Sequence, residues 1–172
     1  MLFRSLIYVV GKTRDELGGS HYYDLYNAIG NCVPKVYHRE AIETFTALSA
    51  ATGKGLVKAI HDCSDGGLAV AAAEMAFSGG LGMEIFLSEV PYQPLCKRDD
   101  FLLFSESNSR FVVEVRKAKQ KEFENTLKGV SFGLAGCLTG KNNFKIYGLD
   151  GKVCVDADTC KLKQAWKEPL KW

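Results

Sequence analysis

The sequence predicts an α+β domain with one mixed β-sheet covered by helices. Two observations lead to this fold class. Short apolar runs typical of strands alternate along the chain with longer stretches in which apolar residues recur every three or four positions, as in helices. The last third then holds several short strand-like runs, and Asp150-Gly151 between two of them is a strong hairpin signal. No repeat, low-complexity tract or linker divides the chain, so we expect a single domain over residues 1–172.

The composition excludes several classes of protein. A chain of 172 residues with 47% hydrophobic residues is long enough to bury a core and is not typical of a disordered protein. The net charge is +2, and Lys and Arg are scattered rather than clustered, so we expect no nucleic acid and no membrane as partners. The apolar N-terminus lacks a small-residue cleavage site and reads as a strand. We therefore expect a cytoplasmic protein.

The cysteines and histidines do not form a metal-binding pattern. There is no C-x-x-C pair, and the three histidines are dispersed, which argues against a zinc site. An even number of cysteines without a secretory context favours reduced thiols, and we expect most of them to be buried. The six are Cys32, Cys63, Cys96, Cys137, Cys154 and Cys160.

The first half of the chain is expected to alternate between strands and helices. The continuous apolar run 6–10 predicts a strand buried on both faces and ended by Gly11. From 37 to about 52, one apolar stripe predicts a helix that faces the core with Ala41, Ile42, Phe45, Leu48 and Ala51. A central strand at 56–60 follows, then a helix at 69–77 with Leu68, Ala71, Ala72 and Met75 on one face, then a half-exposed strand at 83–88.

The second half begins with a surface loop at 89–100, after which residues 101–104 re-enter the core. Further strands are expected at 111–115, 132–138, 144–147 and 153–155, and a charged helix at 118–128, anchored by Phe123 and Leu127. Thr159 is the expected cap of a final helix that ends before Pro169.

The segment 57–68 combines a strand, an acidic turn and a helix start, and it is the main candidate for a functional site. Its carboxylates could hold a cation, and backbone N–H groups at a helix N-terminus could hold a phosphate. The alternative is that Ser64 or Asp65 only caps the helix, and the chemistry alone favours this structural role. The polar residues of the turn are His61, Asp62, Ser64 and Asp65, followed by Gly66 and Gly67.

Two other polar stretches could approach a ligand. Gly18 and Gly19 permit close backbone approach to a ligand, although the pattern alone favours a tight turn. Glu106 could hold a cation or accept from a hydroxyl, and Arg110 could bind a phosphate or a carboxylate. Their spacing of four residues favours a structural pair instead.

These motifs together carry a resemblance to a known family. Residues 61–70, HDCSDGGLAV, continued by AEMA at 73–76 and GGLG at 79–82, resemble the signature of phosphoribosylformylglycinamidine synthase of the subunit II type. ELGGS at 16–20 and LFSES at 103–107, followed by Ser109 and Arg110, match in the same order. The resemblance covers essentially the whole chain. It ends at WKEPL, residues 166–170, as the small form of the family does, with no glutaminase domain behind it.

The turn also distinguishes this chain from other members of the superfamily named after aminoimidazole ribonucleotide synthase. Those relatives carry Thr-Gly-Gly-Gly, Asp-Pro-Thr-Arg-Gly-Gly or Asp-Ile-Ser-Asp-Gly-Leu at the equivalent place. This chain has Ser-Asp-Gly-Gly after His-Asp. The resemblance thus implies that the chain has the fold of the superfamily's C-terminal domain. It also implies that the chain is part of the purine-synthesis enzyme rather than of one of those relatives.

In that family the enzyme is built from four units, and this chain is similar to the last. The family reaction is an ATP-dependent ligation that converts formylglycinamide ribonucleotide and glutamine-derived ammonia into formylglycinamidine ribonucleotide, in de novo purine biosynthesis. The catalytic histidine belongs to another unit, so no catalytic residue is assigned here and the isolated chain is expected to be inactive. The implied partners are the other units, a glutaminase subunit, a small accessory subunit and, as a further option, a second copy of the chain.

The resemblance also implies ligand contacts. Asp62 corresponds to a magnesium ligand, and Ser64, Gly66 and Gly67 correspond to nucleotide-binding residues, with Ser64 as the phosphate contact. Mg²⁺ and ATP or ADP are thus the implied cofactors of the complete enzyme. The first half of the family has a Glu-Ser-Gln pattern at the place of Glu106, Ser107 and Asn108. This chain departs from the pattern at Asn108. Further candidates for ligand or interdomain contacts are Gly18, Gly19, Ser20, His61, Asp65, Glu106, Ser107 and Arg110. The alternative function is a non-catalytic module that docks on a partner domain.

Overall fold

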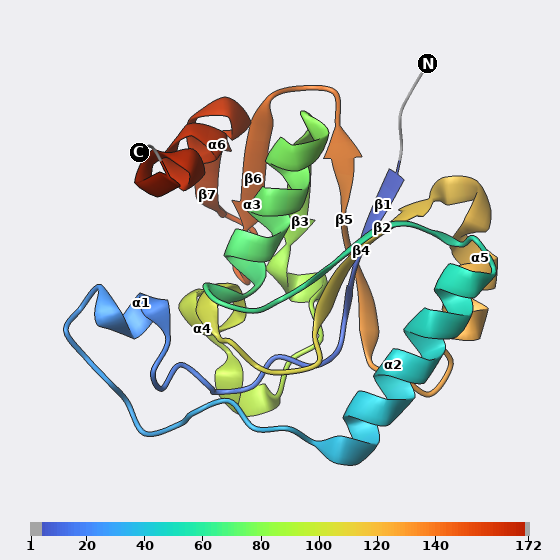
Figure 1. The fold of residues 1–172 in the computed structure, drawn as a ribbon, viewed down its shortest axis with the longest axis horizontal. Coiled ribbons are helices and arrows are strands. Elements are labelled where there is room, and N and C mark those ends of the chain that lie inside the picture. The colour runs from blue at the N-terminus through green and yellow to red at the C-terminus, as the bar shows by residue number, and fades with distance from the viewer. Residues whose placement is uncertain (1–4, 171–172) are drawn as a thin grey trace.

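The computed structural model describes residues 5–170, and these contain one seven-stranded mixed sheet with helices on both faces (Figure 1). The strand order is β2-β4-β1-β5-β3-β6-β7. Only the β3–β6 pair is parallel among the pairs of this sheet. The predicted fold class is confirmed, while the expected domain bounds of 1–172 reach beyond the described residues. The strands are β1 (Ser5–Val10), β2 (Val57–Asp62), β3 (Gly82–Phe86), β4 (Phe111–Arg116), β5 (Phe132–Thr139), β6 (Asn143–Tyr147) and β7 (Val153–Asp158).

The helices are divided between the two faces of the sheet. Helices α3, α4 and α6 contribute to one hydrophobic cluster, and α2 and α5 contribute to the other. The α-helices are α1 (His21–Asp24), α2 (His38–Gly53), α3 (Gly67–Gly79), α4 (Asp99–Phe104), α5 (Gln120–Thr126) and α6 (Thr159–Lys167). Residues 5–170 also contain short 3₁₀ turns, which are η1 (Leu87–Glu89), η2 (Pro94–Cys96), η3 (Lys117–Lys119) and η4 (Glu168–Leu170).

Strand β1 lies in the middle of the sheet and serves both clusters. Ile7 and Val9 pack toward α3, whereas Tyr8 and Val10 pack toward α2 and α5. Successive side chains of a strand point to opposite faces, so a run without polar residues requires cover on both sides. The expected burial of this strand on both faces is confirmed.

The apolar stripe of α2 is only partly buried. Ala41, Leu48 and Ala51 are buried as expected, but Ile42 and Phe45 are 66% and 49% exposed. Thr44 is buried in their place. The expectation that Ile42 and Phe45 face the core was wrong, because the second hydrophobic cluster meets a narrower strip of α2 than the stripe covers.

Strand β2 is an edge strand, although a central position was expected. Within the described part of the chain it pairs with β4 alone, and its alternate residues Lys58, Ile60 and Asp62 are exposed. The helix after it begins at Gly67, two residues earlier than expected, and buries Leu68, Ala71 and Ala72. Among residues 5–170, β2 thus has β4 on one side and no strand on the other.

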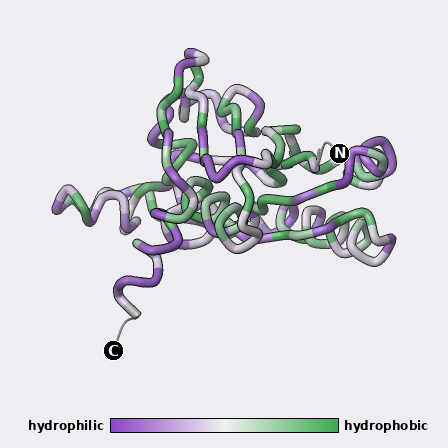
Figure 2. The backbone as a smooth tube through the Cα atoms, turned by 90° about the horizontal axis from the view of Figure 1, so that it is seen from above, coloured by the Kyte–Doolittle hydropathy of each residue, from purple (hydrophilic) through white to green (hydrophobic). Residues whose placement is uncertain are grey.

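The C-terminal third contains the expected hairpin. Strands β6 and β7 pair in antiparallel fashion, and Gly151 has a φ of +78°. The cap of α6 is Asp158, whose carboxylate accepts from Cys160 N and Lys161 N, rather than Thr159. Thr159 is instead the first residue of the helix and is buried. The last described turns carry mainly hydrophilic residues, as the hydropathy colouring shows (Figure 2).

The cysteines were expected to be mostly buried, and this is wrong for those whose surroundings are described. All five are free thiols, but only Cys63 is buried, Cys137 is half-buried, and Cys32, Cys154 and Cys160 are exposed. Strand β7 and the N-terminus of α6 lie at the surface, so their cysteines have no core to enter.

Within residues 5–170, no helix has the length and apolar character needed to cross a membrane.

Candidate functional site

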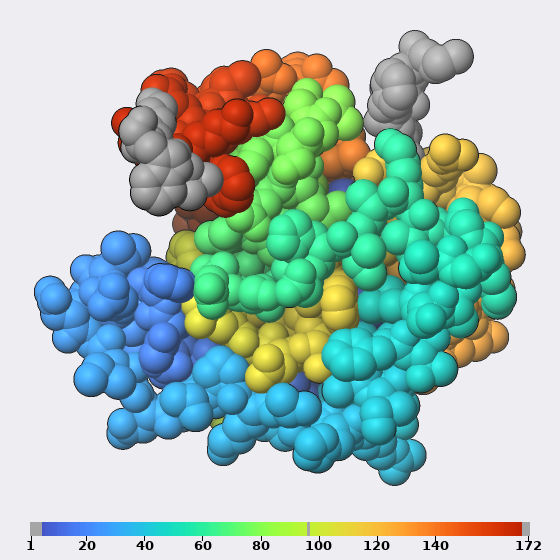
Figure 3. All heavy atoms as spheres, in the orientation of Figure 1, coloured from blue at the N-terminus to red at the C-terminus, as the bar shows by residue number. Residues whose placement is uncertain are grey.

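The turn after β2 and the segment before β4 border one hollow of about 370 Å³. In the space-filling view, the yellow segment near residues 105–110 lies between the green turn after β2, the cyan helix α2 and the light-blue loop that precedes α2 (Figure 3). The hollow brings together five of the predicted site residues. Its lining is Pro34, Phe45, Asp62, Cys63, Ser64, Asp65, Glu106, Asn108, Ser109, Arg110 and Phe111.

Strand pairing places these two segments side by side. Strands β2 and β4 run antiparallel, and Asp62, the last residue of β2, is opposite Phe111, the first residue of β4. The pairing continues by one step, since Cys63 N donates to the Arg110 carbonyl at 2.9 Å. The end of one strand therefore adjoins the start of the other, and their polar turns face the same space.

Asp62 and Ser64 form a small polar unit at the mouth of the hollow. The Ser64 hydroxyl donates to Asp62 Oδ2 at 2.5 Å. This hydrogen bond holds the pKa of the Asp62 carboxyl below its usual value, because it stabilises the ionised form. The Asp62 side chain is 64% exposed, so the carboxylate is accessible to a ligand.

The Glu106 carboxylate accepts a backbone hydrogen bond at the N-terminus of α3. Its Oε1 accepts from Gly66 N at 2.9 Å and from His21 N, the first residue of α1, at 3.2 Å. The N-cap position of α3 is Gly66, and no side chain of the turn itself caps the helix. Capping by Ser64 or Asp65, which the chemistry alone favoured, is therefore wrong, because a carboxylate from a distant segment takes that place.

Gly66 and Gly67 shape the turn through their backbone conformations. Their φ angles are +75° and +64°, in the region that favours glycine. A Cβ atom on Gly67 would lie 2.5 Å from the Ser105 carbonyl oxygen. Their N–H groups have protein acceptors, since Gly66 N donates to Glu106 and Gly67 N to the Ser64 carbonyl at 2.9 Å. A phosphate contact by either N–H would thus require one of these acceptors to move.

Arg110 is a buried structural residue at the base of the hollow. Its guanidinium donates to Thr13 Oγ1 at 2.8 Å, to the Ser107 carbonyl at 3.1 Å and to the Ser105 carbonyl. Burial lowers the pKa of the guanidinium. Because these acceptors use its donors and Glu106 binds N–H groups, the structural pair of Glu106 and Arg110 that the spacing favoured is not formed.

The Gly18-Gly19-Ser20 turn lies outside the lining of the hollow. Gly18 N donates to the Cys32 carbonyl at 2.8 Å, and Gly19 N to the Ile29 carbonyl at 2.7 Å. Ser20 is the N-cap of α1 and accepts from Tyr23 N. These contacts hold the base of α1 and its following loop, which project from the body of the molecule (Figure 1).

His61, Asp65 and Ser107 have different surroundings. The His61 ring lies 3.0 Å from Glu74 Oε2 on α3, away from the lining of the hollow. Asp65 is exposed on the rim and lies 3.8 Å from His21 Nε2. Ser107 is buried and accepts from Arg14 N at 3.0 Å. Of these three candidates, only Asp65 lines the hollow.

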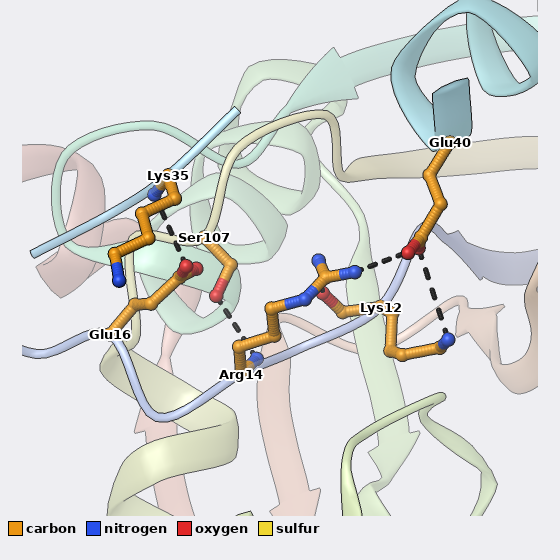
Figure 4. A network of polar contacts seen from close by, with 6 residues as sticks. All are labelled: Lys12, Arg14, Glu16, Lys35, Glu40 and Ser107. Atoms are coloured by element: carbon orange, nitrogen blue, oxygen red, sulfur yellow. Dashed lines mark hydrogen bonds and ion pairs between the residues drawn. The ribbon is translucent and has the colours of Figure 1, made fainter. Parts of the chain in front are cut away.

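A polar network behind Ser107 was not foreseen from the sequence (Figure 4). Arg14 donates to Glu40 Oε2 at 2.7 Å and lies over the ring of Tyr37. The buried Glu16 accepts from Lys35 N at 3.1 Å through Oε1, while its Oε2 has no hydrogen-bond partner. No local pattern predicts these contacts, because they join segments that are separated by about 20 residues or more.

The sequence also did not predict the apolar side of the hollow. Pro34 and Phe45 line it, and Phe45 had been placed in the core because it fits the helical stripe of α2.

Cys63, the buried neighbour of Asp62, has a thiol pKa raised by burial, which disfavours the reactive thiolate. Within residues 5–170, no three His, Cys, Asp or Glu side chains group closely enough to hold a metal ion.

Comparison with known proteins identifies relatives over nearly the whole chain. The phosphoribosylformylglycinamidine synthase subunit PurL of Methanopyrus kandleri is 36% identical over 165 residues, which is 95% of this chain and 22% of that protein. The subunit PurL of Methanocaldococcus jannaschii is 32% identical over 164 residues, again 95% of this chain and 22% of the relative. The chain thus spans about a fifth of the length of these relatives.

Solved structures show the same fold. T. maritima PurL complexed with FGAR superposes with a TM-score of 0.80 at 15% identity, over 94% of this chain and 28% of that one. T. maritima PurL complexed with ATP gives a TM-score of 0.74 at 17% identity, over 94% of this chain and 26% of that one. The PurLQS structure from Thermotoga maritima gives 0.72 at 16% identity, over 92% of this chain and 26% of that one.

Residues 5–147 match the family described as AIR synthase related protein, C-terminal domain. This match includes both turns that border the hollow and six of the seven strands of the sheet. The chain belongs to the family of AIR synthase related proteins, in which it represents the C-terminal domain.

Proposed function

We propose that this chain works as the last of four units of a phosphoribosylformylglycinamidine synthase of the small, subunit II type. The observation that carries the proposal is its 36% identity to PurL of M. kandleri over 165 residues. The complete enzyme would ligate ammonia to formylglycinamide ribonucleotide with hydrolysis of ATP, in purine biosynthesis. This chain would contribute a nucleotide contact rather than the reacting groups.

The nucleotide contact would be formed by Asp62 and Ser64. Magnesium usually binds through one or two carboxylates, waters and the phosphates of a nucleotide, so a single accessible carboxylate fits a magnesium nucleotide better than a metal held by protein alone. Asp62 offers that carboxylate, and the Ser64 hydroxyl, which donates to Asp62 in this structure, would turn to donate to a phosphate oxygen when the nucleotide binds. T. maritima PurL has been solved with ATP, which supports nucleotide binding in the family. Gly66 and Gly67 would set the backbone of the turn.

The partners would be the remaining units of the synthase, a glutaminase subunit and a small accessory subunit, in the cytoplasm. The PurLQS structure supports a multi-subunit assembly. The loop after α1 adds an exposed apolar surface, with Leu25 and Ile29 each 80% exposed. This surface favours association with another unit or a second copy of the chain. A strict monomer in sedimentation at high concentration would count against it.

The same exposed surface also supports the alternative function, a non-catalytic module that docks on a partner domain. The two functions differ in one respect. A docking module would leave ligand binding unchanged when Asp62 is altered, whereas the synthase unit would not.

A reconstitution assay tests the proposed function. Formation of formylglycinamidine ribonucleotide is measured for the 172-residue chain alone, for the other units alone, and for the mixture, with formylglycinamide ribonucleotide, ATP, Mg²⁺ and ammonia supplied. Only the mixture is expected to turn over. Turnover by the chain alone would contradict its assignment as a non-reacting unit, and an unchanged rate on its addition would contradict its place in the synthase.

A further inference from the structure

The hollow beside Asp62 has two chemically different walls. One wall is polar and carries Asp62, Ser64, Asp65, Glu106, Asn108, Ser109 and Arg110. The other is apolar and carries Pro34, Phe45 and Phe111. A ligand that fills both sides must therefore combine a group suited to carboxylates and a hydroxyl with an apolar face.

Phe45 is the most accessible aromatic group on the apolar wall. It stands on α2, is 49% exposed, and lies edge-on to Phe111 with ring centroids 5.9 Å apart and an angle of 80° between the planes. Such a contact holds an aromatic ring in a defined orientation. The ring is thus fixed on one side by Phe111 and open to the hollow on the other.

The volume of the hollow is suited to a small molecule. Pockets for ligands and cofactors are typically about 300–1,000 Å³, and this hollow measures about 370 Å³. An aliphatic chain would match the apolar wall but would make no use of the exposed Asp62 carboxylate. An inorganic phosphate with its metal would match the polar wall but would leave Phe45 exposed.

We propose that the apolar wall is the base subsite of the nucleotide site, with the nucleobase stacked on Phe45 while the magnesium-bound phosphates lie at Asp62 and Ser64. Aromatic side chains stack on any base because every base has a π-face. This inference rests on the proposed nucleotide contact at Asp62. It adds a residue, Phe45, that discriminates a nucleotide from a simple polyphosphate.

The test compares two probes, Mg-ADP and Mg-pyrophosphate, in the assembled synthase. Equilibrium dialysis gives the dissociation constant of each probe at the Asp62-dependent site, which is defined as the binding lost in Asp62→Asn. The variants are Phe45→Ala, the conservative Phe45→Tyr, and the control Ile42→Ala. Ile42 is an exposed apolar residue on the same helix that does not line the hollow.

Phe45→Ala is expected to weaken Mg-ADP binding by about tenfold, the loss of one stacked base, and to leave Mg-pyrophosphate binding unchanged. Phe45→Tyr should retain Mg-ADP binding, and Ile42→Ala should behave as the wild type. If Phe45→Ala weakens both probes equally, or neither, the base subsite is wrong while the Asp62 site stands. If Asp62→Asn changes neither probe, the nucleotide contact fails and the base subsite fails with it.

Discussion

Glu106 and Gly66 are 40 residues apart in the sequence, yet the Gly66 N–H donates to Glu106 Oε1 at 2.9 Å and so caps helix α3. The same oxygen accepts from the His21 N–H. One carboxylate thus joins the start of α3 to the start of α1.

We predict that Glu106→Ala lowers the free energy of unfolding by about 1 kcal/mol, the usual cost of losing a helix cap. Glu106→Gln should lose less, because the amide oxygen still accepts both hydrogen bonds while the favourable charge at the helix N-terminus is removed. Urea unfolding of the three proteins measures this. Equal stability of the wild type and the Ala variant would contradict the capping role.

Asp62→Asn separates a ligand role from a structural role. An Asn still accepts the hydrogen bond from Ser64 but lacks the charge that a hard cation requires. We expect nucleotide retention by the assembled enzyme to fall while the melting temperature of the isolated domain barely moves. The effect should appear only in the assembled enzyme, because one carboxylate and one hydroxyl are too few ligands to hold a magnesium nucleotide.

Ser64→Ala should act in the same direction as Asp62→Asn, since it removes the hydroxyl proposed for the phosphate. A magnesium-dependent nucleotide assay and thermal melts on both variants provide the comparison. A loss of about 1 kcal/mol of stability without any loss of nucleotide would show a purely structural pair.

Gly67→Ala is expected to destabilise the protein strongly. Gly67 has a φ of +64°, and a Cβ atom would lie 2.5 Å from the Ser105 carbonyl oxygen and 2.9 Å from that of Leu103. The left-handed conformation alone costs an Ala about 1–2 kcal/mol, and the contacts add to this. Gly79, in the last turn of the same helix, is the control, because a Cβ atom there meets nothing within 4 Å. Thermal unfolding should show Gly79→Ala to be neutral or stabilising.

The hydrogen bond between Tyr8 and Glu124 should contribute stability that depends on pH. Tyr8 is buried, and its hydroxyl donates to Glu124 Oε1 at 2.6 Å. This bond, followed by that from Gln120, lowers the pKa of Glu124 below its ordinary value of 4.5. A lowered folded-state pKa means that the stabilisation is fully present above the unfolded value and is lost as the pH falls through the folded one.

We therefore expect Tyr8→Phe to cost about 1 kcal/mol at pH 7. The difference between the wild type and this variant should shrink as the pH falls below 4.5. Unfolding curves across that range measure it. A difference that stays constant down to low pH would show that Glu124 does not carry the effect.

The local sequence predicted the elements of this fold well. Ile7 to Val10 read as a strand buried on both faces, and the chain buries them on two sides of the sheet. Met83, Ile85 and Leu87 alternate with exposed or half-exposed neighbours as predicted. These predictions succeed because the period of apolar residues reports directly which faces an element must bury.

The candidate site was predicted in part. Asp62, Ser64 and Glu106 stand in polar turns at strand ends, and the pairing of β2 with β4 brings those turns to one hollow. The sequence by itself determined which polar groups were available and that glycines would shape the turn. It did not reveal that Phe45 would be left uncovered on the apolar wall, or that Glu106 would cap α3.

Those two features were decided only by the tertiary structure. A helical stripe identifies an apolar face, but how much of that face is buried depends on the elements that pack against it, and here the cluster covers Leu48 and not Phe45. A backbone N–H at a helix start needs an acceptor, but the sequence does not say which distant carboxylate will reach it. The pairing of β2 with β4 places Glu106 Oε1 2.9 Å from Gly66 N. The two residues are 40 positions apart, so no local sequence pattern predicts this contact.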